Sequence, residues 1–411
     1  MSRSSDKPER PRPLRRPMLI EKADRIHRLA VDPMEELERA RRRAERRGFT
    51  VIDFTGADPD VLLPEGAPEP EGGGTLSSSA IRRAVAERFR AERGVRLDPE
   101  REILLLPHAR DAFRLFALGF VDHGEVALLP DPGDPAYRAA TTLAGGWPIG
   151  FPLHESRRHL PGLDRIEPEA ARRARLLFIG YPARPLGAAP ERPFYDELVR
   201  FARRNNIVVV QDATLAGAVA PGETPAGLLD HPEGRELGVE VHDLAPLFDC
   251  GGWRPGFAAG NREMLFAART LLDRFPHPPL RTSLPLFRRV LDLPEEERRR
   301  VEALFRSRVD RVTEGLASLS WEVERPRAGH DLWVRVPQGT HSMRFASLLL
   351  RRAGVAVLPG ALFGEFGHGH VLIRPNRDEA SIDEALDRLR RMLPARRRVS
   401  EWFRRRRELL G

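Results

Sequence analysis

The chain has 411 residues, 41% of them hydrophobic, which is enough to bury the core of two domains or of one large domain. Its 68 basic and 60 acidic residues give a formal net charge of +8, but the two signs are interspersed, which favours solvated faces over a nucleic-acid surface. No apolar run approaches the ~20 residues of a membrane helix, and the first residues lack an apolar signal core. The single cysteine, Cys250, excludes a disulfide within the chain, so we expect a cytoplasmic protein.

The first elements are expected to be short and separated by loops. Residues 1–18 are polar and rich in arginine and proline, which predicts disorder. A helix is expected to begin at Asp32 and Pro33, because Asp32 can cap it and proline suits the first turn. A short strand follows at residues 50–54, and the Pro- and Gly-rich residues 59–74 predict a loop.

From there on, short apolar runs alternate with helical patterns. Strands are predicted at residues 103–106, 126–129, 176–179 and 207–210, and helices at 81–89, 111–120 and 194–203. Continuous apolar strands separated by helices are typical of a parallel sheet covered on both faces. After about residue 290 a long charged helix (295–319) is followed by shorter patterns at 331–336, 346–354 and 355–358 and a last helix at 381–392. These predict a smaller domain of helices and strands.

Several motifs follow one another along the chain. They are Lys22-Ala23-Asp24-Arg25-Ile26, Gly124-Glu125-Val126 with Pro130-Asp131-Pro132-Gly133, Gly180-Tyr181-Pro182 to Ala188, Asp212 after an apolar run, Gly252-Trp253-Arg254-Pro255-Gly256, and Val357-Leu358-Pro359-Gly360 with Phe363-Gly364. In this order they resemble the class I/II aminotransferases, and most of all the LL-diaminopimelate aminotransferases. The resemblance covers roughly residues 20–392.

The resemblance implies the fold-type-I architecture of pyridoxal-phosphate enzymes. That α/β fold has a large domain with a mostly parallel seven-stranded sheet and a smaller C-terminal α/β domain, and it forms a homodimer with its sites at the subunit interface. We therefore expect an N-terminal arm and helix at 19–60, a large domain at 61–290, a small domain at 291–392 and a basic tail at 393–411. The cofactor would lie at the carboxyl ends of the strands.

The lysine on which transamination depends is missing. In the family this lysine holds the cofactor's aldehyde covalently and shuttles a proton, and it lies eight residues before the arginine that corresponds to Arg254. That position is Pro246, which has no amine. The only lysines are Lys7 and Lys22, so no residue from 23 onwards can replace it. We do not expect covalent binding of pyridoxal phosphate or ordinary transamination.

Two positions match the family's cofactor site. Asp212 corresponds to the aspartate that stabilises a protonated pyridine nitrogen, and Arg254 to an arginine that binds the phosphate. Each also has a structural interpretation. Asp212 can cap a loop or pair with an arginine, and Arg254 can form an ion pair with Asp243 or Asp249.

Other positions of that site are replaced. By the resemblance, Arg184 stands for the asparagine on the cofactor's phenolic oxygen, Leu215 for a tyrosine, and Asp134 for the aromatic residue that stacks on the ring. His108 begins the segment that replaces the small residues of the phosphate cradle. We predict that the old cavity is narrowed and crossed by charge pairs, with Arg184 facing Asp212 or Asp134.

The remaining two replacements concern the phosphate and the substrate. Asp243 stands for a serine beside the lysine, and its charge would repel a phosphate. The arginine that grips the substrate carboxylate falls at Leu372, whereas Arg374 lies two residues on, on the same strand face. Arg374 is therefore the candidate for substrate binding.

Three further features favour structural roles. Cys250 stands where the family has an apolar residue, so we expect a buried thiol and not a nucleophile. The His368-Gly369-His370 segment lacks acidic or cysteine residues at metal-ligand spacing, which favours a loop over a metal site. The Gly72-Gly73-Gly74 run lacks the Lys-Ser/Thr ending of a phosphate loop.

Three functions remain open. The first is a pseudoenzyme that binds or assembles with a partner, as a homodimer or with an active aminotransferase or another enzyme. The second is an enzyme that binds pyridoxal or pyridoxamine phosphate non-covalently and acts on an amino acid. The third is a protein whose arginine-rich ends, at 10–16 and 396–407, bind nucleic acid or an acidic partner.

Overall fold

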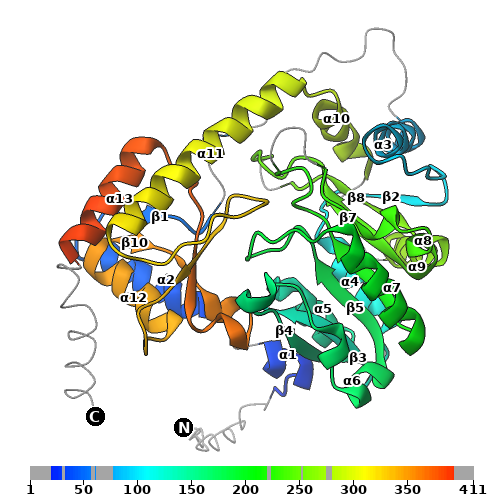
Figure 1. Cartoon of the computed structure of the whole chain (residues 1–411), viewed down its shortest axis with the longest axis horizontal. Helices are drawn as coiled ribbons and strands as arrows, with labels where there is room; N and C mark the ends of the chain where they lie inside the picture. The colour runs from blue at the N-terminus through cyan, green and yellow to red at the C-terminus, as the bar shows by residue number, and fades with distance from the viewer. Residues whose placement is uncertain are drawn as a thin grey trace, which may run out of the picture.

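A seven-stranded sheet forms the centre of the larger domain in the computed structural model (Figure 1). The structure describes residues 20–29, 33–56, 61, 77–219, 224–250, 253–274 and 280–392. In spatial order the strands are β2 (Ile103–Leu106), β8 (Gly256–Gly260), β7 (Gly238–Asp243), β6 (Val208–Asp212), β5 (Ala174–Gly180), β3 (Val126–Asp131) and β4 (Trp147–Pro152). The strands from β7 to β4 run parallel, and β8 runs antiparallel to both of its neighbours. The predicted mostly parallel sheet is confirmed.

Helices pack on both faces of this sheet. They are α3 (Ser78–Arg93), α4 (Asp111–Phe120), α5 (Pro135–Leu143), α6 (Pro168–Arg173), α7 (Arg192–Asn205), α8 (Gly234–Leu237), α9 (Arg262–Arg274) and α10 (Leu280–Leu291), with 3-10 turns η1 (Glu155–Arg157), η2 (Leu163–Arg165) and η3 (Leu228–Asp230). Helices α4, α5 and α9 share one hydrophobic cluster, and α7 belongs to another. None of the helices in the described parts of the chain has the length and apolar character needed to cross a membrane.

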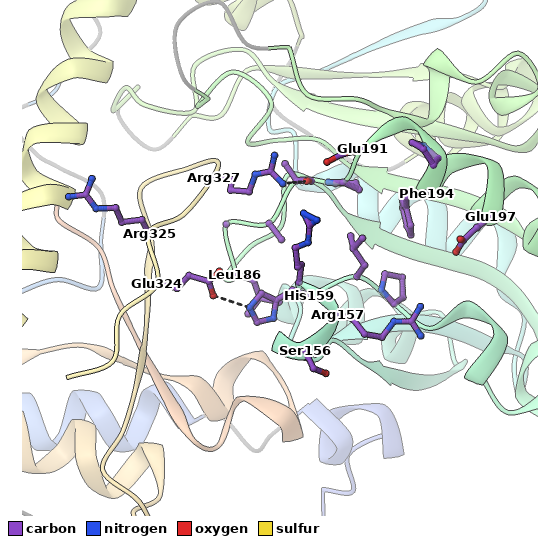
Figure 2. Close-up of a pocket in the computed structure, with 18 residues that line it drawn as sticks. Ser156, Arg157, His159, Leu186, Glu191, Phe194, Glu197, Glu324, Arg325 and Arg327 are labelled. Carbon is purple, nitrogen blue, oxygen red and sulfur yellow. Dashed lines mark hydrogen bonds and ion pairs between the residues drawn. The ribbon is translucent and has the colours of Figure 1, made fainter. Parts of the chain in front are cut away.

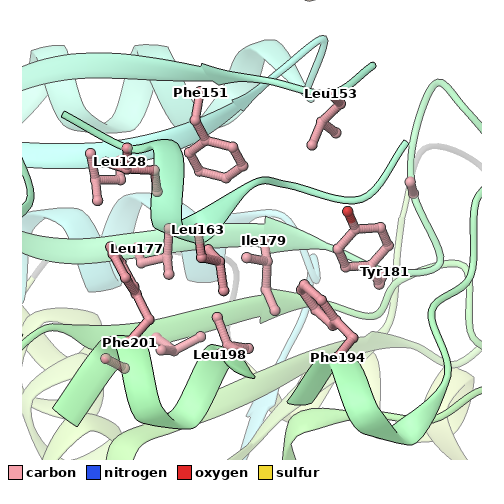
Figure 3. Packing of buried hydrophobic residues seen from close by; sticks show 14 of the residues in the cluster. Leu128, Phe151, Leu153, Leu163, Leu177, Ile179, Tyr181, Phe194, Leu198 and Phe201 are labelled. Carbon is pink, nitrogen blue, oxygen red and sulfur yellow. The ribbon is translucent and has the colours of Figure 1, made fainter. Parts of the chain in front are cut away.

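The packing of strand β5 explains the continuous apolar run at residues 176–179. Its Leu177 and Ile179 pack with α7 on one face of the sheet (Figure 3). Its Leu176 and Phe178 pack with α4 and α5 on the other face. Since successive side chains of a strand point to opposite faces, a strand covered on both faces must be apolar at every position.

The small domain includes part of the N-terminal segment. Its elements are α2 (Pro33–Glu45), β1 (Ile52–Asp53), α11 (Glu295–Ser318), β9 (Leu332–Arg335), α12 (Ser342–Ala353), β10 (Val355–Ala356), β11 (Leu358–Pro359), η4 (Gly360–Phe363), η5 (Glu365–Gly367), β12 (His370–Ile373) and α13 (Glu379–Met392). Leu37, Ala40 and Ala44 of α2 lie in the same hydrophobic cluster as α12 and α13, and β1 pairs with β10. Residues 33–54 therefore pack with residues 309–392, while their expected role as a dimer arm stays a prediction.

One predicted strand differs from the sequence-based expectation, and three strands were not predicted. Residues 355–358 do not form one strand, because β10 pairs with β1 whereas β11 pairs with β12 in a three-stranded antiparallel sheet. Strands β4, β7 and β8 are not among the apolar runs identified in the sequence. The expected disordered ends, the Asp32 cap and most of the loop at 59–74 lie outside the described residues.

At the sheet's edge, β4 leaves two large side chains in solvent. Trp147 and Ile149 are both exposed, and the guanidinium of Arg28 lies 5.1 Å from the Trp147 ring centre. Arg28 belongs to α1 (Asp24–Leu29), which packs beside α5. The described part of the N-terminal segment therefore contacts both domains of its own chain.

The carboxylate of Asp131 joins the two domains. It stands at the end of β3, and its oxygens accept hydrogen bonds of 3.0 Å from the backbone N–H groups of Glu365 and Phe366. The N–H of Gly133 donates in turn to the carbonyl of Phe363 at 2.8 Å. These three bonds attach the loop after β11 to the carboxyl edge of the large sheet.

A buried ion network holds α3 to the sheet. The Arg93 guanidinium donates to both oxygens of Glu240, at 2.5 and 3.0 Å, and to Asp230 at 2.9 Å. His242 Nε2 lies 2.9 Å from Glu240, whose side chain is 0% exposed. Burial alone would raise the pKa of Glu240, but Arg93 and His242 outweigh it and hold the pKa far below its ordinary value.

Replacing Arg93 should therefore be strongly destabilising. Arg93→Met leaves the Glu240 charge buried without its main partner, and we expect a loss of about 3–5 kcal/mol in the free energy of unfolding by urea. Because the native pKa of Glu240 is depressed, its stabilising contribution is present above the unfolded-state pKa, near 4.5, and is lost as the pH falls further. The difference in the free energy of unfolding between wild type and Arg93→Met should therefore shrink as the pH falls below about 4.5.

The matched control is Arg88→Met, on the same helix. Arg88 pairs with Glu92 at 2.7 Å on the surface, so its loss should change stability by no more than about 1 kcal/mol. Equal losses from the two variants, or a gap that does not depend on pH, would contradict the proposed role of the buried network.

Candidate functional site

A small cavity, called here the inner cavity, lies at the carboxyl edge of the large sheet and beside the small domain. Its volume is roughly 100 Å³, and its walls include Arg184, Leu215, Pro246, Arg254, Asp331 and Arg374. Five of these six were singled out in the sequence, and the structure brings all five together. The carboxyl edge is where open α/β sheets bind ligands.

Asp331 lies between two of the arginines of this cavity. Its Oδ2 is 3.6 Å from Arg184 Nε, and its Oδ1 is 3.3 Å from Arg374 Nε. Arg374 also donates to the carbonyl of Thr55 at 2.8 Å. One carboxylate of the chain itself therefore offsets the charge of both guanidinium groups.

The predicted pairing of Arg184 with Asp212 or Asp134 is wrong. Asp134 caps α5 by accepting from the Ala136 N–H at 2.9 Å, and it forms an ion pair with Arg110. The oxygens of Asp212 are likewise occupied, as described next. Since both acidic groups have other partners, Arg184 pairs with an aspartate from the small domain.

Asp212 is held by neutral groups at the end of β6. It is 5% exposed and accepts from the Tyr137 hydroxyl at 2.5 Å, the Thr214 hydroxyl at 2.5 Å and the Thr214 N–H at 2.9 Å. Burial and the charge of Asp134 raise its pKa above the ordinary value. Burial and the Asp212 charge also raise the pKa of Tyr137. The phenol therefore stays protonated and donates a hydrogen bond to Asp212.

Tyr137 is a site residue that the sequence analysis did not assign. Its ring stacks on Phe178 at 5.1 Å between centres, and both side chains are fully buried. Its position three residues after Asp134, in the first turn of a helix that begins at a strand end, was the only signal available. That signal places the residue near the site but does not reveal its hydroxyl's partner.

Arg254 forms the expected ion pair with Asp243. The two side chains lie 3.8 Å apart, and Asp243 also accepts from the Ala245 N–H at 2.8 Å. Burial raises the pKa of Asp243, and Arg254 offsets part of that rise. His108 is half-buried beside them, and burial lowers its pKa, which favours a neutral ring.

Apolar side chains line the part of the inner cavity around Pro246. The Pro246 ring packs against Gly217, where an added Cβ would lie 3.3 Å from the ring. The Leu215 side chain packs in the same way against Gly329, where an added Cβ would lie 3.2 Å from it. Leu372 is buried in the core beside Trp333, whereas Arg374 reaches the inner cavity. The inner cavity therefore contains guanidinium and carboxylate groups but no amine among its walls.

The other candidates remain structural. Burial raises the pKa of Cys250 to about 11, which makes the thiol a poor nucleophile. The rings of His368 and His341 lie 4.3 Å apart, but no group of three or more potential metal ligands occurs in the described part of the chain. The Gly72–Gly74 run lies outside the described residues.

Comparison with known proteins identifies the family. The model of aminotransferase class I and II matches residues 70–389. The chain belongs to this family. It is 32% identical to an LL-diaminopimelate aminotransferase of Moorella thermoacetica, over 91% of this chain and 99% of that one. It is 34% identical to the enzyme of that name from Desulforudis audaxviator, over 91% and 98%.

Solved structures confirm the fold-type-I architecture. A probable N-succinyldiaminopimelate aminotransferase from Thermus thermophilus is 28% identical, with a TM-score of 0.80 over 88% of this chain and all of that one. An aspartate aminotransferase variant from the same genus is 23% identical, with a TM-score of 0.77 over 91% of this chain, and supports the fold alone.

The residues present do not fit pyridoxal phosphate, the cofactor of this family. A pyridinium needs an ionised aspartate, but Asp212 already accepts three hydrogen bonds from Tyr137 and Thr214, and its pKa is raised. A phosphate beside Arg254 would also meet the carboxylate of Asp243, whose side chain is 8% exposed. Asp134, the residue that by the resemblance corresponds to the stacking ring, is a carboxylate paired with Arg110.

Asp212→Asn should stabilise the protein at neutral pH. Because the folded-state pKa is raised, the folded state prefers the neutral side chain, and ionisation becomes unfavourable as the pH rises through that pKa. Asparagine is neutral throughout and can still bond Tyr137 and Thr214. We expect a higher thermal midpoint than wild type at pH 7, and no advantage below the ordinary aspartate pKa of 3.8.

The comparison variant is Asp212→Ala, which leaves the Tyr137 hydroxyl buried without an acceptor. It should be about 1–3 kcal/mol less stable than Asp212→Asn at every pH. A lower midpoint for Asp212→Asn at pH 7 would show that this aspartate is stabilised in its charged form, as in a working cofactor site.

Proposed function

We propose that this chain is a class I/II aminotransferase homologue that does not catalyse transamination and acts as a binding or assembly partner. The absence of an amine carries the proposal. Pro246 stands in the lysine's place, and no lysine follows Lys22. An aminotransferase without that amine lacks both the covalent attachment of its cofactor and the group that moves the proton.

The contacts of the inner cavity support this function over non-covalent use of the cofactor. Asp212 and Arg254 are the two retained positions, yet each already has partners within the chain. Asp212 accepts from Tyr137 and Thr214, and Arg254 lies 3.8 Å from Asp243. A cofactor would have to compete with these groups without gaining the covalent link. We therefore do not propose the relatives' LL-diaminopimelate chemistry for this chain.

A dimer is the assembly that we propose, in the cytoplasm. The partner is a second copy of this chain or an active member of the family, because a retained family fold keeps surfaces that can pair with either. Sedimentation velocity should give twice the chain mass of 46.4 kDa for the purified protein. A monomer that also fails to associate with an intact aminotransferase co-expressed with it would contradict the assembly.

Added pyridoxal phosphate should not attach to this site. We expect borohydride reduction followed by peptide mapping to give no stoichiometric label, since Lys7 and Lys22 are the only lysines. The described one, Lys22, is exposed. Stoichiometric labelling at Lys22, with a chromophore that an amino acid bleaches, would overturn the non-catalytic function.

Restoring the amine alone should not restore catalysis. In Pro246→Lys the lysine would enter a site in which Asp243, Asp134 and Leu215 remain, so the phosphate, the ring and the phenolic oxygen of the cofactor still lack partners. Each missing contact is worth about 1 kcal/mol or more. Half-transamination, followed by absorbance with excess cofactor and glutamate, should stay at the wild-type baseline. Clear turnover would show that the lysine is the only group that the chain lacks for catalysis.

A further inference from the structure

A large cavity at the rim of the large domain does not concentrate charge at one point. Its volume is about 440 Å³, within the range of small-molecule sites. Figure 2 shows that three of its arginines, Arg157, Arg325 and Arg327, point in different directions. Their charges therefore do not act together on one bound group.

The inner cavity has the opposite arrangement, because the guanidinium groups of Arg184 and Arg374 face one space. Their Nε atoms lie 3.6 and 3.3 Å from the two oxygens of Asp331, and all three side chains line the cavity. The two arginine side chains are 27% and 25% exposed, so neither is sealed in the core. Two cations thus share one carboxylate of the chain.

Most donors of these two groups have no acceptor. A guanidinium carries five N–H bonds. The Arg184 side chain makes no hydrogen bond with any described residue; its Nε is buried, whereas its two Nη atoms remain accessible. The Arg374 side chain makes one hydrogen bond, from Nη1 to the carbonyl of Thr55. The inner cavity therefore offers more donors than acceptors.

The charges of the cavity are unequally offset. Burial lowers the pKa of Arg374, and the nearby charge of Arg184 lowers it further, against the effect of Asp331. At Arg184, burial is outweighed by Asp331, Asp134 and Asp212, which raise its pKa. The negative charge that the chain supplies is therefore insufficient on the Arg374 side of the cavity.

Backbone contacts hold both arginines in position. Arg184 belongs to the segment after β5, where the N–H of Gly187 donates to the carbonyl of Ala183 at 2.7 Å. Arg374 follows β12, and its own N–H donates to the carbonyl of Phe54 at 3.1 Å. Groups that are already in place lose little conformational entropy when an anion binds.

The size of the inner cavity limits its ligand. Roughly 100 Å³ corresponds to about three water molecules at ~30 Å³ each, so only a few heavy atoms fit. Leu215, Pro246 and Phe305 add apolar surface to the walls. Asp249, the other acidic residue of the described walls, already has an interaction of its own. A small group with one negative charge and a short apolar end suits these walls.

We propose that the inner cavity binds a short-chain monocarboxylate, of the size of acetate, between Arg184 and Arg374. The carboxylate accepts hydrogen bonds from the Nη atoms of the two guanidinium groups, and the methyl group lies toward Leu215 and Phe305. The site differs from the substrate position implied by the resemblance, which falls at Leu372 in the core. This inference rests on the proposed function, because the cavity must be free of pyridoxal phosphate.

Three probes test the charge and the size of such a ligand in titrations of the full-length protein at constant ionic strength. Acetate should saturate and should bind at least about tenfold more tightly than acetamide, its neutral isostere, because guanidinium groups bind charged acceptors more strongly. Benzoate, which is too large for the cavity, should not compete with acetate. Equal affinities for acetate and acetamide, or no saturable binding of acetate, would refute the proposal.

A competition experiment separates this inference from the proposed function. Added pyridoxal phosphate should not displace bound acetate. Displacement would contradict the proposed function and leave the acetate site in place, whereas the absence of acetate binding contradicts only the inference drawn from the inner cavity.

Substitutions should change the affinity for acetate in opposite directions. Arg184→Gln should weaken it by about tenfold, and Arg374→Gln makes the same test should the first variant not fold. Asp331→Asn should strengthen it by a similar factor, because it removes the carboxylate that competes for both arginines. The control Arg172→Gln removes an exposed arginine that pairs with Glu169 and should change nothing. If Asp331→Asn weakens binding, or if the control changes it as much as Arg184→Gln does, the proposed site is wrong.

Discussion

The carboxylate of Asp331 is the constraint on which the inner cavity depends. It comes from the small domain and lies between Arg184, from the large domain, and Arg374, which follows β12. Two guanidinium groups facing each other in a half-buried space need an anion, and an anionic ligand commonly supplies it in such a place. Here the chain supplies one carboxylate of its own, while Arg184 Nε and Asp331 Oδ2 are buried without a hydrogen-bond partner in the described structure. The other pairs, Asp134 with Arg110 and Asp243 with Arg254, follow the same rule.

The architecture around the inner cavity does not depend on the arginine–aspartate pairs alone. The sheet, its helices and the Asp131 junction between the domains do not depend on the cofactor contacts. Asp331, from the small domain, lies 3.6 Å from Arg184 of the large domain, so this ion pair adds a second link between the domains.

The fold could be predicted wherever burial leaves a periodic signal. Strands β2, β3, β5 and β6 are apolar at nearly every position and were found as runs. Strand β7 was missed because it contains Glu240, which Arg93 reaches from helix α3, and His242, which lies 2.9 Å from Glu240. Strand β8, with the sequence Gly-Phe-Ala-Ala-Gly, has too few large residues to form a pattern. Such strands are defined by their neighbours and not by their own composition.

Less of the site could be predicted. The Arg254–Asp243 pair could be anticipated because the two residues are close in sequence. The partner of Arg184 and the role of Tyr137 depend on how a small-domain segment and a helix meet the sheet, which no local pattern specifies. Arg184, Arg254 and Arg374 were placed in the right cavity, but which residues pair with them was decided by tertiary geometry.

The two prolines of β4 have a consequence for self-association. The backbone N–H groups of Trp147 and Leu153 donate to carbonyls at the two ends of β3. In the alternation of a strand, the backbone N–H positions of residues 148, 150 and 152 therefore point away from the sheet. Two of those three positions are Pro148 and Pro152, which have no N–H to offer. A strand from another molecule would find few donors there, despite the exposed Trp147 and Ile149 nearby. The open edge is thereby protected against uncontrolled growth into fibrils.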